Sequence, residues 1–142
     1  MCVAFPTSKV VTMFENTSPA EFERLARETI ASLPVELRGP LERAGLRIDE
    51  FASERQLQSV GLADRWELSG LYEGIPLTEQ SVWSSGEPPA VISLFRQPLL
   101  REMRETGVGL RELVRHVVIH EGGHHFGFSD ADMHALEDSV RD

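Results

Sequence analysis

The residues with the clearest chemical role lie near the carboxyl end of the sequence, where histidine and glutamate recur at helical spacing. His120 and His124 are four residues apart, so a helix would carry both imidazoles on one face, one turn apart. Two neutral imidazoles at that spacing can occupy adjacent corners of a tetrahedral zinc site. Glu121 follows the first histidine, beside the metal rather than on it, where it can take a proton from zinc-bound water. The pattern H-E-x-x-H therefore predicts one Zn²⁺ ion with a general base next to it.

The residues after this motif include candidates for a third zinc ligand. Gly127 breaks the helix three residues after His124, which allows the chain to turn back. Asp130 then arrives close enough to supply a carboxylate. Three protein ligands leave the fourth position for water, which is typical of a catalytic zinc. His134 and Glu137 are alternative third ligands if the chain after Gly127 folds differently.

Four neighbouring side chains have simpler interpretations. His116 shares the ligand face one turn earlier, but a third ligand on the same straight helix would reach past the metal, so a supporting role is favoured. His125 points about 100° away from the second motif histidine, which favours a packed or hydrogen-bonded side chain. Asp132 competes with Asp130 for the role of third ligand, but a capping position in the first turn of a short last helix suits it better. Met133 is expected in the core, with an apolar floor beneath the metal as its functional alternative.

The rest of the sequence predicts the elements that must position the motif. Its own helix is expected to begin near Leu110 and to end at Phe126, with Gly127 following. An earlier amphipathic helix is predicted over residues 19–32, because Ser18-Pro19-Ala20-Glu21 combines a capping serine, an initial proline and a capping-box glutamate. The other predicted elements are a short segment from Pro34 that Gly39-Pro40 interrupts, a strand at Leu46–Asp49, a helix from Ser53 to Val60, a strand-like stretch at Gly70–Leu77, a loop at Ser84–Pro89, a strand at Val91–Phe95 and a helix from Pro98 to Thr106. This order predicts an α+β fold.

Length and composition indicate one soluble domain. The chain has 142 residues, of which 41% are hydrophobic, and we expect a tail over residues 1–17 and a domain over residues 18–142. Cys2 is the single cysteine, so an intramolecular disulfide and a cysteine-built zinc site are excluded. The net charge of −9 disfavours nucleic acid and anionic membranes as partners. The sequence contains no signal-peptide pattern and no apolar run near the roughly 20 residues of a membrane helix, so we expect a cytoplasmic protein.

The extended pattern H-E-x-x-H-x-x-G-x-x-D, from His120 to Asp130, resembles the metzincin-type zinc peptidases in the variant with aspartate as third ligand. The sequence is more closely similar to the minimal-zincin family of small bacterial zinc metallopeptidases, through residues 70–77, 92–100 and 120–133. The resemblance covers roughly residues 19–137. It implies zinc ligands at His120, His124 and Asp130, with Glu121 as general base. It also implies a compact zincin-like α+β fold in which a small mixed sheet packs on the motif helix.

The sequence departs from this family at one position, because Gly122 stands where a bulky aliphatic residue is usual. Two adjacent glycines, Gly122 and Gly123, cost roughly 1 kcal/mol each in a helix interior relative to alanine. A side chain that would pack behind the motif helix is also absent. The zinc ligands implied by the resemblance are nevertheless intact.

The expected reaction is zinc-assisted hydrolysis of an amide bond in a peptide or protein substrate. Val91–Phe95 is expected to be the edge strand that aligns an extended substrate. Tyr72 is a candidate donor to the oxyanion, although a packing role fits it better. Two alternatives bind zinc equally well: a regulatory or interaction module without peptidase activity, and a hydrolase of a non-peptide substrate. The sequence does not indicate the substrate or the oligomeric state.

Overall fold

The structure of the chain is a computed structural model that describes residues 16–74, 90–128, 131–133, 135 and 138. It is an α+β fold, as predicted. Its elements are α2 (Pro19–Ala31), α3 (Val35–Arg43), β1 (Gly45–Asp49), α4 (Glu54–Ser59), the 3-10 turn η1 (Arg65–Glu67), β2 (Gly70–Glu73), β3 (Val91–Phe95), α5 (Arg96–Thr106) and α6 (Leu110–His125). Asp130, His134, Glu137, residues 1–15 and the predicted loop at 84–89 lie outside the described residues.

The sheet is small and mixed, and its strand order is β1-β3-β2. β3 pairs in parallel with β1, where Leu46 lies opposite Ile92, and antiparallel with β2, where Tyr72 lies opposite Ile92. The expectation that Val91–Phe95 is an edge strand is therefore wrong. Both of its backbone edges are already paired within the sheet, so a substrate cannot add a strand there. Among the described strands, the two edges belong to β1 and β2.

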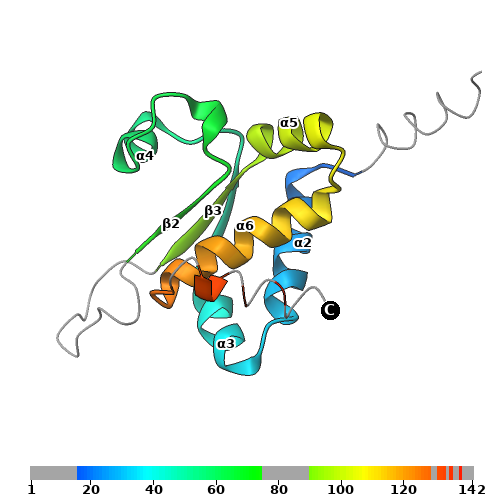
Figure 1. Cartoon of the computed structure of the whole chain (residues 1–142), viewed down its shortest axis with the longest axis vertical. Coiled ribbons are helices and arrows are strands. Elements are labelled where there is room, and N and C mark those ends of the chain that lie inside the picture. The colour runs from blue at the N-terminus through cyan, green and yellow to red at the C-terminus, as the bar shows by residue number, and fades with distance from the viewer. Residues whose placement is uncertain (1–15, 75–89, 129–130, 134, 136–137, 139–142) are drawn as a thin grey trace, which may run out of the picture.

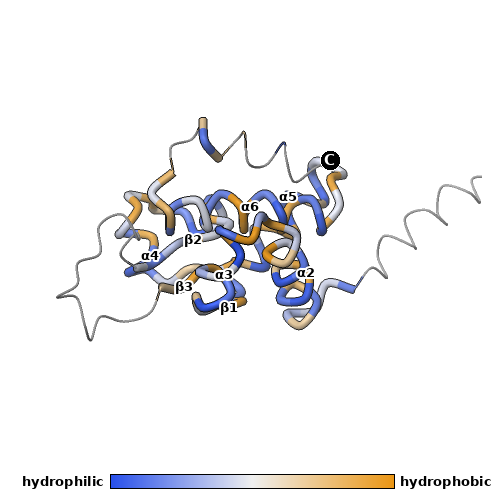
Figure 2. Tube along the Cα trace, turned by 90° about the horizontal axis from the view of Figure 1, so that it is seen from below, coloured by the Kyte–Doolittle hydropathy of each residue, from blue (hydrophilic) through white to orange (hydrophobic). Residues whose placement is uncertain are grey.

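One face of the sheet carries the main helices (Figure 1). α6 packs across β2 and β3, and α2 lies against both α6 and β1. The hydrophobic side chains buried between these elements include Phe22, Leu94 and Val118, none of them measurably exposed. Along the helices, hydrophobic and hydrophilic residues alternate (Figure 2), as expected where one face of each helix enters the core. The sheet and α2 thus hold α6 from two sides.

Capping serines explain where α2 and α4 begin, as predicted. The Ser18 hydroxyl accepts a hydrogen bond from the backbone N–H of Glu21, and α2 buries one face, made of Phe22, Leu25, Ala26, Thr29 and Ile30, as expected of an amphipathic helix. Glu21 pairs with Arg24 instead of completing the capping box. At α4, Ser53 and Gln56 form a full, reciprocal box. Within the described residues no helix is long and apolar enough to cross a membrane.

Two predicted boundaries are wrong for a physical reason. Gly39-Pro40 does not interrupt the second helix, because α3 continues to Arg43 with Pro40 inside it. Leu41, the residue after that proline, is only 2% exposed and packs into the core, and this packing outweighs the local helix-breaking tendency. α5 begins at Arg96 rather than at Pro98, immediately after β3, and ends at Gly107 with φ 76°, as predicted.

Candidate functional site

Helix α6 presents three histidines on the side that faces away from the core. His116 is exposed and His120 and His124 are half-buried, whereas Val114, Val118 and Ile119 on the opposite side are fully buried. The ring centroids of His116 and His120 are 6.1 Å apart, and the planes of the two rings are inclined by 23°. The ring centroids of His120 and His124 are 5.1 Å apart, and the planes of these two rings are inclined to each other by 65°. The apolar period of α6 therefore fixes which face carries the imidazoles.

The spacing of His120 and His124 fits a shared metal ion. Two imidazoles that meet at a tetrahedral zinc, with Zn–N bonds near 2.0 Å, place their ring centroids about 5 Å apart. The observed 5.1 Å matches this value. No group of three or more His, Cys, Asp or Glu side chains within the described ranges could hold a metal. The predicted third ligand, Asp130, lies outside those ranges.

Glu121 is a carboxylate placed where a proton acceptor would be useful. It is 9% exposed, and its Oε1 lies 3.3 Å from Nδ1 of His124. It makes no hydrogen bond to any other described residue, which is unusual for a buried carboxylate. It also lines a pocket of about 280 Å³ next to His120. A buried acid that is open to a pocket, beside two potential metal ligands, has the position of a general base.

The start of the edge strand β2 lines this pocket, through Gly70 and through Ser69 just before it. A Cβ at Gly70 would lie 2.2 Å from Cγ1 of Val117 and 3.5 Å from Cγ of Glu121. Only glycine permits so close an approach of the strand to α6. The strand backbone is therefore brought next to the carboxylate of Glu121.

Met133 is buried, 4% exposed, and packs directly on α6. A Cβ at Gly123 would meet Cγ of Met133 at 2.6 Å and its Sδ at 2.7 Å. The prediction that Met133 is a core residue is confirmed. Gly123, inside the H-E-x-x-H motif, thus allows the chain after α6 to return against the motif helix. Residues 131–133 are helical, as predicted for the last segment.

The missing side chain at Gly122 is replaced by a neighbour. A Cβ at this position would lie 3.1 Å from Cδ1 and 3.4 Å from Cδ2 of Leu41 in α3. Leu41 therefore fills the space in which a bulky aliphatic residue at position 122 would pack. The departure from the family pattern leaves the core filled rather than hollow.

The two glycines are expected to respond differently to alanine. Gly123→Ala should lower the free energy of unfolding by about 1–3 kcal/mol, because its Cβ would displace the middle of the Met133 side chain. Gly122→Ala should change it by less than about 1 kcal/mol, because the gain in helix propensity offsets a contact that the end of Leu41 can relieve. Urea unfolding of both variants measures the difference. Equal effects of the two substitutions would show that Met133 does not constrain Gly123.

Tyr72 and His125 form a second polar contact on α6, away from the pocket. The Tyr72 hydroxyl is hydrogen-bonded to Nδ1 of His125 at 2.9 Å. His125 is 5% exposed, so its predicted role as a packed, hydrogen-bonded residue is confirmed. This bond ties β2 to the end of α6. It also commits the Tyr72 hydroxyl to His125, which does not support Tyr72 as the oxyanion donor.

Burial lowers the pKa of His125 below its usual value of 6.5, and the nearby positive charge of Arg43 lowers it further. The folded state therefore favours the neutral imidazole of His125 over its protonated form. Its contribution to stability is complete above the pKa of the unfolded chain, near 6.5, and is lost as the pH falls through the lowered folded value. The metal-free protein should be less stable at pH 5.5 than at pH 7.5.

The variant His125→Asn tests this pH dependence, because asparagine can still bond to the Tyr72 hydroxyl but does not titrate. Its unfolding free energy should change less between the two pH values than that of the wild type. All other acids and histidines are present in both proteins, so their contribution to the pH dependence of the unfolding free energy cancels in the comparison. An identical change in both proteins would remove His125 as the source.

Several features of the pocket have no clear signal in the sequence. Its described lining also includes Glu67 and Leu68 from η1 and the residue after it, Glu102 from α5, and His116 and Val117 from α6. The two glutamates lie 35 residues apart in the chain, and neither belongs to a recognisable motif. Gly70 belongs to the predicted strand-like stretch at 70–77, but its sequence context does not indicate a close approach to α6. The structure alone brings these residues to His120 and Glu121.

A family model described as "Zincin-like metallopeptidase" matches residues 41–140. This match includes the sheet, α5, α6 and the chain that follows, whereas α2 lies before it. No curated protein matches the chain. Since the family model covers more than half of the sequence, the chain belongs to the zincin-like metallopeptidase family.

Proposed function

We propose that this chain is a zinc-dependent peptidase with its catalytic centre at the pocket beside α6. His120 and His124 would hold one zinc ion, and Asp130 would complete the set of protein ligands. The observation that carries the proposal is the matched spacing of the two imidazoles, 5.1 Å between centroids, next to the buried carboxylate of Glu121. Membership in the zincin-like metallopeptidase family supports both the metal and the class of reaction.

The chain's own residues would carry the proton transfers. Zinc, when bound, supplies a lowered pKa of water, near 7, and polarisation of the scissile carbonyl. Glu121 accepts the proton of the attacking water and then delivers it to the leaving amine. Its position favours this role, because the carboxylate is buried and lines the pocket next to His120.

The substrate backbone would be aligned by β2. This strand is an edge of the described sheet, and its first residue, Gly70, lies against Val117 and Glu121. An extended peptide that pairs with the side of β2 on which no described strand lies would place its carbonyls beside the pocket. This replaces the earlier assignment of substrate alignment to β3, which is the central strand.

Hydrolysis of a mixed peptide library, with metal analysis of the same sample, tests the proposal. We expect one zinc ion per chain, cleavage that a chelator abolishes, and recovery when zinc is added back. Bound zinc without cleavage of any peptide would favour the interaction module or a non-peptide substrate. Absence of zinc binding would contradict all three functions.

A further inference from the structure

The pocket beside Glu121 has a strongly acidic wall opposite the motif helix. Glu67 from η1 and Glu102 from α5 line it together with Glu121, and both are exposed. Neither forms an ion pair with another described residue. No lysine or arginine is among the described residues that line the pocket. The carboxylates that face a bound substrate are therefore not neutralised by side chains from the described part of the chain.

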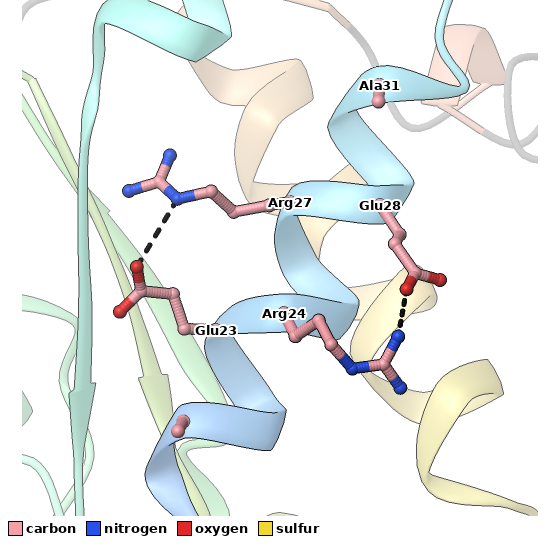
Figure 3. Close-up of a pocket in the computed structure, with 6 residues that line it drawn as sticks. Glu23, Arg24, Arg27, Glu28 and Ala31 are labelled. Carbon is pink, nitrogen blue, oxygen red and sulfur yellow. Dashed lines mark hydrogen bonds and ion pairs between the residues drawn. The ribbon is translucent and has the colours of Figure 1, made fainter.

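A second hollow on the molecule shows the contrasting arrangement. It lies on the outer face of α2, and its volume of about 540 Å³ exceeds that of the pocket beside Glu121. Its acids are paired within the helix: Arg27 with Glu23, and Arg24 with Glu28 (Figure 3). Such self-neutralised pairs leave little charge for a ligand. The acids of the pocket beside Glu121 have no such arginine partners among the described residues, in contrast to those of α2.

The position of Glu67 is fixed by the residue before it. The Trp66 backbone N–H donates to the Asp64 carboxylate at 2.9 Å, and the Trp66 ring packs edge-on against Phe51. The Arg101 guanidinium lies 4.9 Å from the centre of the Trp66 ring. It also donates a hydrogen bond to the backbone carbonyl oxygen of Trp66 at 3.3 Å. These contacts hold η1 against α5, so Glu67 is kept on the rim of the pocket near Glu102.

Two arginines on these elements, Arg65 and Arg101, are already engaged in contacts with aromatic rings. Arg101 lies over Trp66 and within 3.8 Å of Glu105, while Arg65 lies 3.9 Å from the centre of the Phe51 ring. Stacked guanidinium groups keep their position by both cation–π attraction and hydrogen bonding. They are engaged on the aromatic side of η1, and neither arginine lines the pocket.

We propose that this pocket accepts a lysine or arginine side chain of the substrate next to the scissile bond, with Glu67 and Glu102 as specificity-determining residues. The proposal rests on the proposed peptidase function and names the substrate class of that site. The half-buried His120 and the buried Glu121 form the pocket floor, where partial exclusion of water strengthens the attraction between a cation and the two rim carboxylates. A substrate acid at the same position would be repelled.

Three peptides that differ at one position, as lysine, norleucine or glutamate, test the preference. For the wild type, kcat/KM should be highest for lysine and lowest for glutamate. Glu67→Gln and Glu102→Gln should each lower the lysine-to-norleucine ratio about 2- to 5-fold, and the double variant about 10-fold. Glu36→Gln makes the same change in net charge at an exposed position away from the pocket, and its ratio should equal that of the wild type.

Binding of the same peptides to zinc-loaded Glu121→Gln protein, measured by fluorescence anisotropy, gives a readout that does not require hydrolysis. The preference for lysine should be present at low salt and largely absent at 1 M salt, because the interaction is electrostatic. If no peptide is cleaved, the peptidase function fails, and the binding order alone decides the charge preference. Equal binding of all three peptides, or a lysine preference that survives in Glu67→Gln/Glu102→Gln, would overturn the inference.

Discussion

Glu121→Gln is expected to lower peptide hydrolysis by about 100- to 10,000-fold while one zinc ion per chain remains bound. Glutamine has nearly the same shape as glutamate, but its amide cannot accept the proton of the attacking water. Zinc should be retained because Glu121 is assigned beside the metal and not on it. Single-turnover hydrolysis and metal analysis on the same preparation measure both quantities.

The folded state should tolerate this substitution. Glu121 is a 9% exposed carboxylate without a hydrogen bond to the described residues, so replacing its charge with a neutral amide relieves a desolvation cost. Glu112→Gln is the matched control, since Glu112 lies on the same helix, is exposed and is paired with Arg115. It should hydrolyse peptides at the wild-type rate. Full activity in Glu121→Gln would mean that another group acts as the base.

The motif helix was predictable because several local signals agree on it. The apolar period from Leu110 to Val118 predicts a buried face, and the same period leaves the three histidines on the other side. Gly127 has φ 74°, a conformation that glycine adopts without strain, so the predicted end of the helix is correct. Residue type, period and termination are encoded within one short stretch, and the structure reproduces all of them.

The place of β3 in the sheet was not predictable in the same way. Val91–Phe95 has the composition of a strand, but composition does not state how many neighbours a strand has. Four of its five residues are buried, which is typical of a central strand covered on both faces. The near-continuous apolar run Val91-Ile92-Ser93-Leu94-Phe95 was the available signal. A half-exposed edge strand would be expected to alternate.

The contacts around the two motif glycines illustrate a second limit of the sequence. Leu41 packs on Gly122 and Met133 on Gly123, from elements that precede and follow α6. The sequence shows the two glycines and predicts their cost in helix propensity. It does not show that Leu41 and Met133 fill the space beside them. Such complementarity between distant residues is set by tertiary packing, which overrides local propensity. Pro40 inside α3 has the same explanation, because the helix continues to bring Leu41 to Gly122.

Asp130→Ala is expected to weaken zinc binding by at least about 100-fold, more than the 10- to 100-fold typical of a residue that only supports a ligand. The reason is that the substitution would remove one of the three proposed protein ligands and leave only His120 and His124. Competition with a chromophoric chelator measures the affinity. Asp132→Ala is a close control, since it removes the same charge two residues away at an exposed position. It should bind zinc within a few-fold of the wild type.

The same titration, which includes Asp132→Ala, decides between Asp130 and the alternative third ligands. His134→Ala and Glu137→Ala should keep wild-type affinity if Asp130 coordinates the metal, and a large loss in either would transfer the assignment to that residue. Met133, which lies three residues after Asp130 and one before His134, packs on Gly123 of the H-E-x-x-H helix. Gly123→Ala should therefore weaken zinc binding together with stability, whereas Gly122→Ala should leave zinc affinity unchanged.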